Sequence, residues 1–147
     1  MRALCVIFVF CLISSMATGP ARAQETGVQE AVEETLAALV TNEFTTFADF
    51  FHDDARGFFV DGSRMIEGLG VMAFRAAYLA GLRTNVVMSN LNVRVYGNTA
   101  VSGALLGGSV TLPGGAVRDG TWRYSDTRIL EEGTWKIVQY HISQLLE

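Results

Sequence analysis

The chain is poor in the residues that bind metals, form disulfides or act as thiol nucleophiles. Its 147 residues include two cysteines, Cys5 and Cys11, both close to the N-terminus. The two histidines, His52 and His141, are far apart, and no closely spaced set of metal ligands occurs. A G-x-S-x-G nucleophile motif and a phosphate-cradling glycine loop are also missing. We therefore expect no metal site and no cofactor.

Positive charge is scarce as well. The chain has 11 basic and 15 acidic residues, a formal net charge of −4, and Lys136 is its single lysine. A protein that binds nucleic acid displaces counterions with a basic surface, and no basic block occurs here. The charge balance therefore excludes nucleic acid as a partner. The length and the apolar content of 50% suit one globular domain.

Residues 1–23 have the organisation of a secretory signal peptide. Arg2 supplies a positive charge, and the apolar run Ala3–Ile13 follows it. Ala21-Arg22-Ala23 fits the small-x-small rule, which predicts cleavage before Gln24. The alternative is an uncleaved membrane anchor, although the apolar run is short for a membrane span. We expect a bacterial periplasmic or secreted protein that has no cysteine and no membrane segment after cleavage.

Residues 24–147 are expected to form a single domain whose helices precede most of its strands. Apolar residues recur at helical spacing in three segments, which are 28–40, 44–51 and 71–82. Between the second and third segments, His52-Asp53-Asp54 predicts a turn and Asp61-Gly62 predicts a hairpin.

The second half of the chain has the patterns of strands. Alternating apolar and polar residues from Asn90 to Val95 predict a half-buried strand, and Gly97-Asn98 predicts the turn after it. Further strands are expected over 99–112, 116–130 and 135–145. The fold class is therefore α+β, with three N-terminal helices packed on a curved, mostly antiparallel sheet. We expect the helices and the sheet to enclose a cone-shaped cavity.

The most specific motif lies at the end of the chain. Gly133-Thr134-Trp135-Lys136-Ile137-Val138 is followed by His141-Ile142-Ser143. Together with Phe50–Ala55 and Gly97–Val101, this ending resembles the nuclear transport factor 2-like superfamily, in its SnoaL-like branch. The resemblance covers nearly all of residues 24–147 and implies the cone-shaped fold. It implies no single activity, because the superfamily includes isomerases, cyclases, dehydratases, epoxide hydrolases and modules that only bind or oligomerise.

The last two strands can be aligned by placing Leu130 opposite Trp135. In this register, one face of the hairpin carries Trp122, Tyr124, Asp126, Arg128, Ile137, Gln139 and His141. The other face carries Thr121, Arg123, Ser125, Thr127, Val138, Tyr140 and Ile142. A slip of one residue would exchange the faces of one strand, so the division depends on the register.

The first face suggests acid/base chemistry. Tyr124 would lie opposite His141, and Asp126 opposite Gln139. His141 is then a candidate general base, with Asp126 and Tyr124 as candidates to orient it or to donate a proton. The alternative is a structural histidine on an aromatic outer face that forms a homodimer.

The second face is expected to line the cavity. The resemblance implies this, because the steroid isomerase branch has a pocket tryptophan, and the kinase association domain a pocket arginine, at the position of Ile142. The expected ligand contacts are Arg123, Val138, Tyr140 and Ile142, with Tyr78 from the third helical segment. Arg123 would anchor an anionic or carbonyl group. The alternative is a solvated arginine at the rim.

A paired-carboxylate site at Asp53-Asp54 is less favoured than a turn or a helix cap. In the steroid isomerase branch the catalytic acid lies five residues after the second aspartate, and Phe59 occupies that position here. Two functions are left open. An exported binding or accessory module for a small, partly apolar molecule is favoured, and a cofactor-independent lyase, cyclase or isomerase is the alternative.

Overall fold

The computed structural model describes residues 20–59, 64–67 and 71–145, which form three helices and one six-stranded sheet. The helices are α1 (Pro20–Thr41), α2 (Phe44–Asp49) and α3 (Val71–Leu79). The strands are β1 (Phe51–Phe58), β2 (Ile66–Glu67), β3 (Arg83–Tyr96), β4 (Thr99–Thr111), β5 (Val117–Glu131) and β6 (Thr134–Gln144). This arrangement confirms the predicted α+β class.

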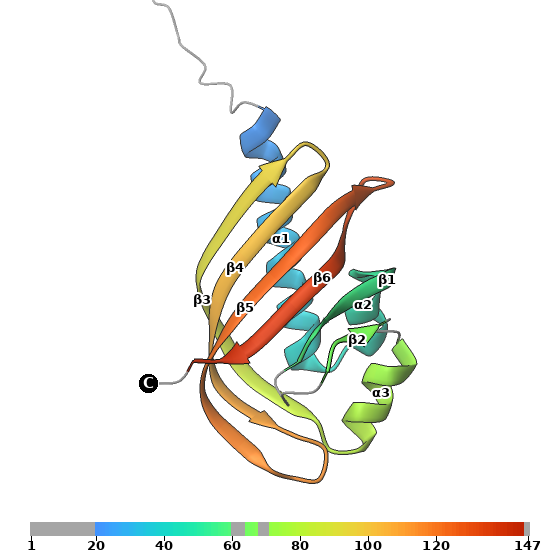
Figure 1. Ribbon diagram of the computed structural model, residues 1–147, viewed down its shortest axis with the longest axis vertical. Helices are drawn as coiled ribbons and strands as arrows, with labels where there is room; N and C mark the ends of the chain where they lie inside the picture. Colours follow the sequence, from blue (N-terminus) through green and yellow to red (C-terminus); the bar gives the residue numbers. More distant parts are fainter. Residues whose placement is uncertain (1–19, 60–63, 68–70, 146–147) are drawn as a thin grey trace, which may run out of the picture.

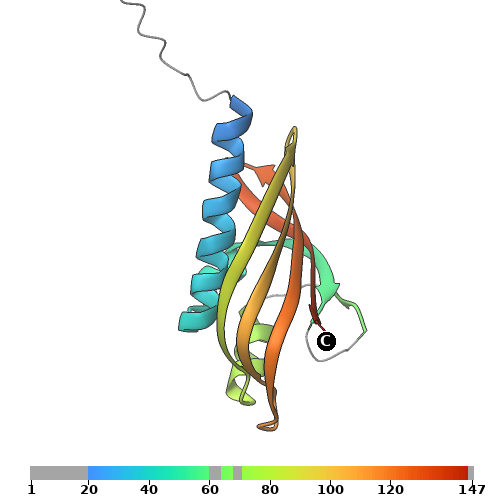
Figure 2. The same cartoon turned by 90° about the vertical axis from the view of Figure 1, so that its left-hand side faces the viewer.

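The strands of the sheet follow the order β2-β1-β6-β5-β4-β3. Neighbouring strands are antiparallel except β1 and β6, which are parallel. The four long strands twist and curl together, so that the sheet has a concave face (Figure 1, Figure 2). The predicted sheet, curved and mostly antiparallel, is therefore confirmed.

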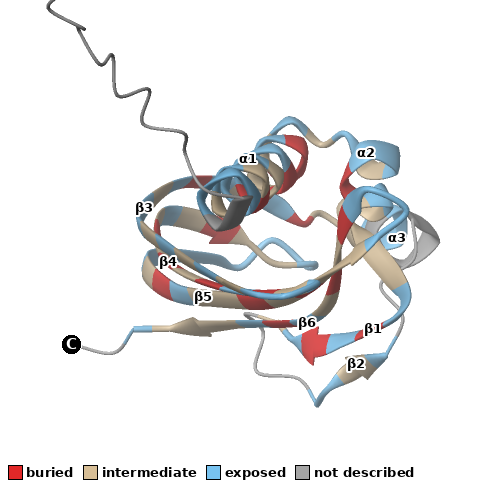
Figure 3. Cartoon of the chain, turned by 90° about the horizontal axis from the view of Figure 1, so that it is seen from above, coloured by how far each residue is buried: buried red, intermediate tan, exposed pale blue. Residues whose placement is uncertain are grey.

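Helix α1 runs along the concave face of the sheet, and α2 lies beyond its end beside α3 (Figure 2, Figure 3). The predicted apolar stripe of α1 packs onto the sheet, because Val28, Val32 and Leu39 are all buried. Buried residues occur along all four long strands (Figure 3), and several of them pack in clusters with residues of α1. One core cluster surrounds Trp122 and Ile137, and a second one joins Val28 and Val32 to Trp135.

Strand β1 corrects the predicted turn at His52-Asp53-Asp54. These residues continue an extended segment that pairs in parallel with β6, from Phe51 opposite Ile137 to Phe58 opposite His141. The paired positions flank these three residues, because Phe51 lies opposite Ile137 and Arg56 opposite Gln139, with a register shift between them. Pairing on both sides therefore holds the segment extended. The predicted turn at Asp61-Gly62 lies outside the described residues.

The β5–β6 hairpin corrects the predicted register. Leu130 does lie opposite Trp135, as expected. The pairing then shifts, because Arg128 pairs with Ile137 whereas the preceding Thr127 pairs with Gln139. Val138 is therefore the extra residue of a β-bulge, and beyond it every residue of β6 changes face relative to β5.

The N-terminal expectations fall mostly outside the described residues. Helix α1 begins at Pro20, so the predicted cleavage position after Ala23 lies in its first turn. In the part of the chain that the structure describes, no helix is long and apolar enough to cross a membrane.

Candidate functional site

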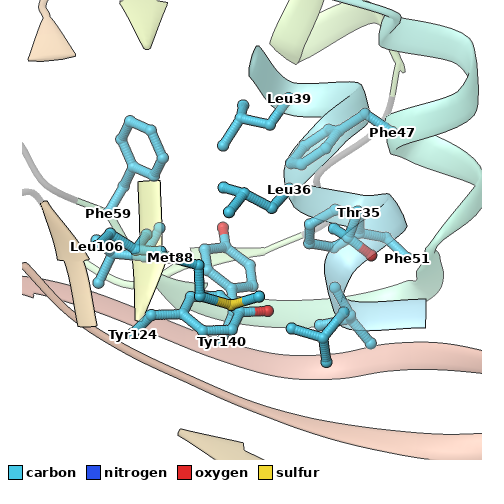
Figure 4. A pocket seen from close by; sticks show the side chains of 13 residues that line it. Thr35, Leu36, Leu39, Phe47, Phe51, Phe59, Met88, Leu106, Tyr124 and Tyr140 are labelled. Carbon is cyan, nitrogen blue, oxygen red and sulfur yellow. The ribbon is translucent and has the colours of Figure 1, made fainter. Parts of the chain in front are cut away.

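A cavity lies between α1, α2 and the concave face of the sheet (Figure 4). It holds about 550 Å³ of empty space, including the solvent at its mouth. Every long strand and the first two helices contribute to its walls. The lining residues are Val32, Thr35, Leu36, Leu39, Phe47, Phe51, Phe59, Met88, Leu106, Tyr124, Ile137, Tyr140 and Ile142.

The wall of this cavity is almost entirely apolar. Of its 13 lining residues, ten have hydrocarbon or thioether side chains, and the other three carry a hydroxyl group. The hydroxyl residues are Thr35 from α1, Tyr124 from β5 and Tyr140 from β6. No acidic, basic or imidazole side chain occurs among these described lining residues. Such a wall suits a ligand with a large apolar part and few polar groups.

Tyr140 is held against the wall by close packing. Its ring meets that of Phe51 edge to face, with the ring centroids 5.6 Å apart. On β1, Gly57 faces the same ring, and a Cβ at Gly57 would overlap the Tyr140 carbonyl oxygen and lie 2.6 Å from the ring. Glycine is therefore required at position 57 for β1 and β6 to approach this closely.

A buried polar network lies behind one corner of the cavity. The Tyr124 hydroxyl donates to Asp126 Oδ2 across 2.5 Å, and Arg128 Nε donates to the same oxygen across 2.8 Å. Arg128 Nη2 donates to Thr35 Oγ1 across 3.1 Å. The side chains of Asp126 and Arg128 are both 0% exposed, so this is a fully buried ion pair. It links two of the three hydroxyl residues of the cavity wall, Tyr124 and Thr35.

Simple periodicity explains how β5 places this network. The network residues on β5 occupy every second position, which are Tyr124, Asp126 and Arg128. Their side chains therefore point to the same face of the strand. Burial, together with the negative charge of Asp126, raises the pKa of Tyr124 far above the ordinary value. Tyr124 therefore keeps its proton and acts as a hydrogen-bond donor to Asp126 at physiological pH.

The structure brings together two of the three candidate catalytic residues. Tyr124 and Asp126 are in direct contact, but His141 lies on the opposite face of the sheet. It pairs with Ser125 rather than Tyr124, is exposed, and meets the ring of Phe58 at a centroid distance of 5.6 Å. The predicted assembly of His141 with Asp126 and Tyr124 is therefore wrong, and the bulge at Val138 is the cause.

The predicted ligand contacts divide in the same way. Tyr140 and Ile142 line the cavity. Arg123 and Val138 do not: Arg123 is exposed on the outer face, and Val138 is the half-buried bulge residue. Tyr78 also lies outside this cavity, where its ring contacts Phe44 and the guanidinium of Arg83.

The aromatic face that suggested a homodimer is part of the core. Trp122 is 1% exposed and Trp135 is 7% exposed, and both lie on the inner face of the sheet. Their aromatic character is therefore accounted for by packing within one chain. Of the residues used in that prediction, His141 is on the outer face.

Sequence reasoning did not anticipate two members of the network. The alternation along β5 puts Arg128 on the correct strand face, and the spacing Asp126-x-Arg128 is typical of a pair on one side of a strand, but no role is predicted for Arg128 from the sequence. Thr35 comes from a helix 93 residues earlier, and no local pattern distinguishes it. Among the described residues, no group of three or more His, Cys, Asp or Glu side chains could hold a metal ion.

Comparison with known proteins places the chain in a family. The model of the SnoaL-like domain matches residues 28–147. No curated protein matches the sequence.

Solved structures share the fold at low sequence identity. An NTF2-like protein from Cytophaga hutchinsonii is 21% identical, with a TM-score of 0.71 over 83% of this chain and 98% of that chain. A ketosteroid isomerase-like protein from Erwinia carotovora atroseptica is 13% identical, with a TM-score of 0.69 over 84% and 98%. An NTF2-like protein from Pseudomonas putida is 16% identical, with a TM-score of 0.70 over 88% and 92%. With the family model matching most of its length, the chain belongs to the SnoaL-like domain family.

Proposed function

We propose that this protein is a binding or accessory module that holds a small, largely apolar molecule in the cavity under α1. The composition of the wall supports this most strongly, because ten of the 13 lining side chains are apolar and the rest are hydroxyl residues. Transfer of apolar ligand surface out of water provides the driving force, and a few hydroxyl groups orient the molecule.

The wall also argues against ordinary acid/base catalysis. A general base needs a group that titrates near the working pH and that reaches the substrate. Asp126 and Arg128 are sealed behind Tyr124 and Thr35, and His141 lies on the other side of the sheet. The position at which the resemblance expects the isomerase acid is Phe59, whose side chain lines the cavity.

Occupation of the cavity can be tested with an apolar fluorescent probe. N-phenyl-1-naphthylamine should bind the wild-type protein with enhanced fluorescence. Leu36→Phe adds volume inside the cavity and should weaken probe binding at least tenfold. Val87→Phe is the matched control, because Val87 is 74% exposed on the outer face of β3. Native mass spectrometry of the purified protein should detect any ligand that co-purifies. Equal probe affinity in both variants would reject the proposed site.

A second function has one observation in its favour. The 2.5 Å hydrogen bond between Tyr124 and Asp126 places a proton donor with a charged partner at the cavity wall. A cofactor-independent lyase, cyclase or isomerase would need Tyr124 to turn this proton from Asp126 to the substrate and act as a general acid. In that case Tyr124→Phe would abolish turnover of a bound substrate while leaving its affinity within a few-fold, whereas a binding module shows no turnover to lose.

Export to the periplasm or the exterior is also a proposal. The apolar leader and Ala21-Arg22-Ala23 support it. The intact mass of the exported protein should correspond to a chain that begins at Gln24. A periplasmic product that retains Met1 would contradict cleavage and favour the membrane anchor.

A further inference from the structure

The polar corner of the cavity has hydrogen-bonding requirements that restrict what can bind there. It is formed by Thr35 on the helix wall and Tyr124 on the sheet wall (Figure 4). The Tyr124 hydroxyl donates its proton to Asp126 Oδ2, and the Thr35 hydroxyl donates to the carbonyl oxygen of Ala31 across 2.6 Å. Each hydroxyl group has one hydrogen, so both donors are committed within the protein. These two hydroxyl groups can therefore offer a ligand only acceptor lone pairs.

The network behind the corner is short of partners. Asp126 Oδ1, Arg128 Nη1 and Ser102 Oγ are buried and have no hydrogen-bond partner among the described residues. Ser102 lies opposite Asp126 in the β4–β5 register, so these groups share one region of the inner face. Buried polar groups normally find partners, because an unsatisfied one costs free energy. The region therefore has an acceptor, a donor and a hydroxyl group available to a polar group that reaches it.

The charge of this corner is balanced. Asp126 and Arg128 neutralise each other at 2.8 Å, and no other charged side chain lines the cavity among the described residues. A carboxylate or ammonium ligand would lose its hydration without gaining a free counter-charge. This corrects the expectation that Arg123 would anchor an anion, because Arg123 is exposed on the outer face of the sheet.

We propose that the ligand has an apolar body and one neutral head group that donates a hydrogen bond, such as an alcohol hydroxyl. The head group lies at the corner between Thr35 and Tyr124 and donates to the free lone pairs there. This inference rests on the proposed binding function and names the class of molecule that the cavity selects.

Three six-membered ring compounds of similar size test the inference. Cyclohexanol donates and accepts, cyclohexanone only accepts, and cyclohexanecarboxylate is an anion at neutral pH. Each is titrated against the complex of the wild-type protein with N-phenyl-1-naphthylamine. Cyclohexanol should displace the probe about fivefold more tightly than cyclohexanone, which corresponds to one net hydrogen bond. Cyclohexanecarboxylate should be the weakest of the three.

The outcomes separate the inference from the proposed function. If neither the naphthylamine probe nor any of the three compounds binds, the proposed function fails. If the probe binds but the alcohol and the ketone compete equally, the function stands and the inference fails. Tighter competition by the ketone or by the carboxylate would show that the corner supplies a free donor or a free positive charge. Either result would overturn the inference.

Single substitutions test which hydroxyl group of the cavity wall gives the preference for cyclohexanol. Tyr124→Phe removes the hydroxyl at the corner and should reduce the preference for cyclohexanol to less than twofold. Tyr96→Phe makes the same change on a ring that is 67% exposed and should leave the preference unchanged. If Tyr140→Phe removes the preference and Tyr124→Phe does not, recognition belongs to Tyr140 and the inference is wrong.

An NMR measurement on the wild-type protein does not depend on the folding of any variant. With bound cyclohexanol, the proton on the hydroxyl-bearing carbon should show nuclear Overhauser contacts to the methyl group of Thr35. The opposite side of the ring should contact other lining side chains. Contacts from that proton to the far wall, without any to Thr35, would overturn the inference.

Discussion

The two faces of the β5–β6 hairpin use similar residues in different ways. On the inner face, Asp126 and Arg128 are fully buried and are bonded to each other, to Tyr124 and to Thr35. On the outer face, Arg123 and His141 are exposed. Charge and aromatic character therefore do not identify the functional face. Connection to buried partners identifies it, because a buried charge persists only when other groups satisfy it.

A single residue, Val138, determines which side chains of β6 belong to the inner face. Insertion of one alanine between Gln139 and Tyr140 would shift the alternation of β6 by one residue and turn Tyr140 and Ile142 outward. Removing two large side chains from the inner face should cost about 5 kcal/mol or more, which is comparable with the whole stability of a small domain. We expect the insertion variant to be unfolded by circular dichroism.

Val138→Ala is the control for this insertion. It keeps the number of residues and hence the register, so it should fold and lose about 1 kcal/mol in urea unfolding. A well-folded insertion variant with a buried Tyr140 would mean that β6 can form a bulge at another position, and the face assignment would then depend less on Val138.

Truncation of the buried acid gives the next largest effect. Asp126→Ala leaves Arg128 buried without its ionic partner and should lower the free energy of unfolding by about 3–5 kcal/mol. Arg123 comes one residue before Tyr124, on the exposed face of β5. Arg123→Ala should change the free energy of unfolding by less than about 0.5 kcal/mol. Urea denaturation of both variants measures the contrast.

The double variant Asp126→Leu with Arg128→Met sharpens this contrast. It removes both charges, and apolar replacements of buried ion pairs are often tolerated. It should therefore recover much of the stability lost in Asp126→Ala. If the double variant is less stable than Asp126→Ala, the pair contributes more to stability than it costs to desolvate.

The sequence was sufficient to predict most of the fold, because its signals are local. Helical spacing predicted the stripe that includes Val28 and Val32, and the turn between β3 and β4 followed from Gly97-Asn98. Strand β1 was missed because its polar residues 52–54 lie between two positions, Phe51 and Arg56, that pair with β6, which comes some 80 residues later in the chain. Long-range pairing of this kind leaves no periodic signal.

The candidate site was predicted only in part, for a related reason. Tyr124 and Asp126 were identified, since alternation along one strand is enough to place them together. The bulge at Val138 has no signal in the sequence, because Ile137 and Val138 are both apolar and either one fits the inner face, so the faces of β6 beyond it were exchanged. Thr35 could not be found locally, because its role comes from the packing of α1 on the sheet.

Alkaline pH distinguishes the inner tyrosine from the exposed one. Burial raises the pKa of Tyr124 above its ordinary value of 10.0. The unfolded chain ionises this tyrosine above pH 10, whereas the folded protein keeps it protonated, so the free energy of the unfolded state falls relative to that of the folded state as pH rises. Stability should fall by about 1.4 kcal/mol for each pH unit above 10 from this group.

Tyr124→Phe should flatten this decline, and Tyr96→Phe should not. Urea denaturation of the three proteins between pH 9 and pH 11 measures the difference. Parallel curves for wild type and Tyr124→Phe would show that Tyr124 ionises in the folded protein as easily as in the unfolded chain.

The smallest effects on stability are expected on the outer face of the sheet, through which we propose that the homodimer forms. Without the buried tryptophans, its remaining support is the set of exposed apolar side chains Phe58, Val87 and Val101, with His141 beside Phe58.

His141→Ala should change the free energy of unfolding of the monomer by less than about 0.5 kcal/mol, because the ring is exposed. It should also leave the affinity of the cavity for N-phenyl-1-naphthylamine unchanged, since His141 and the cavity lie on opposite faces. Light scattering over a range of concentrations should detect a wild-type dimer and weaker association of His141→Ala. A wild-type protein that stays monomeric at high micromolar concentration would reject the homodimer, and a loss of probe affinity in His141→Ala would show that the two faces are coupled through β6.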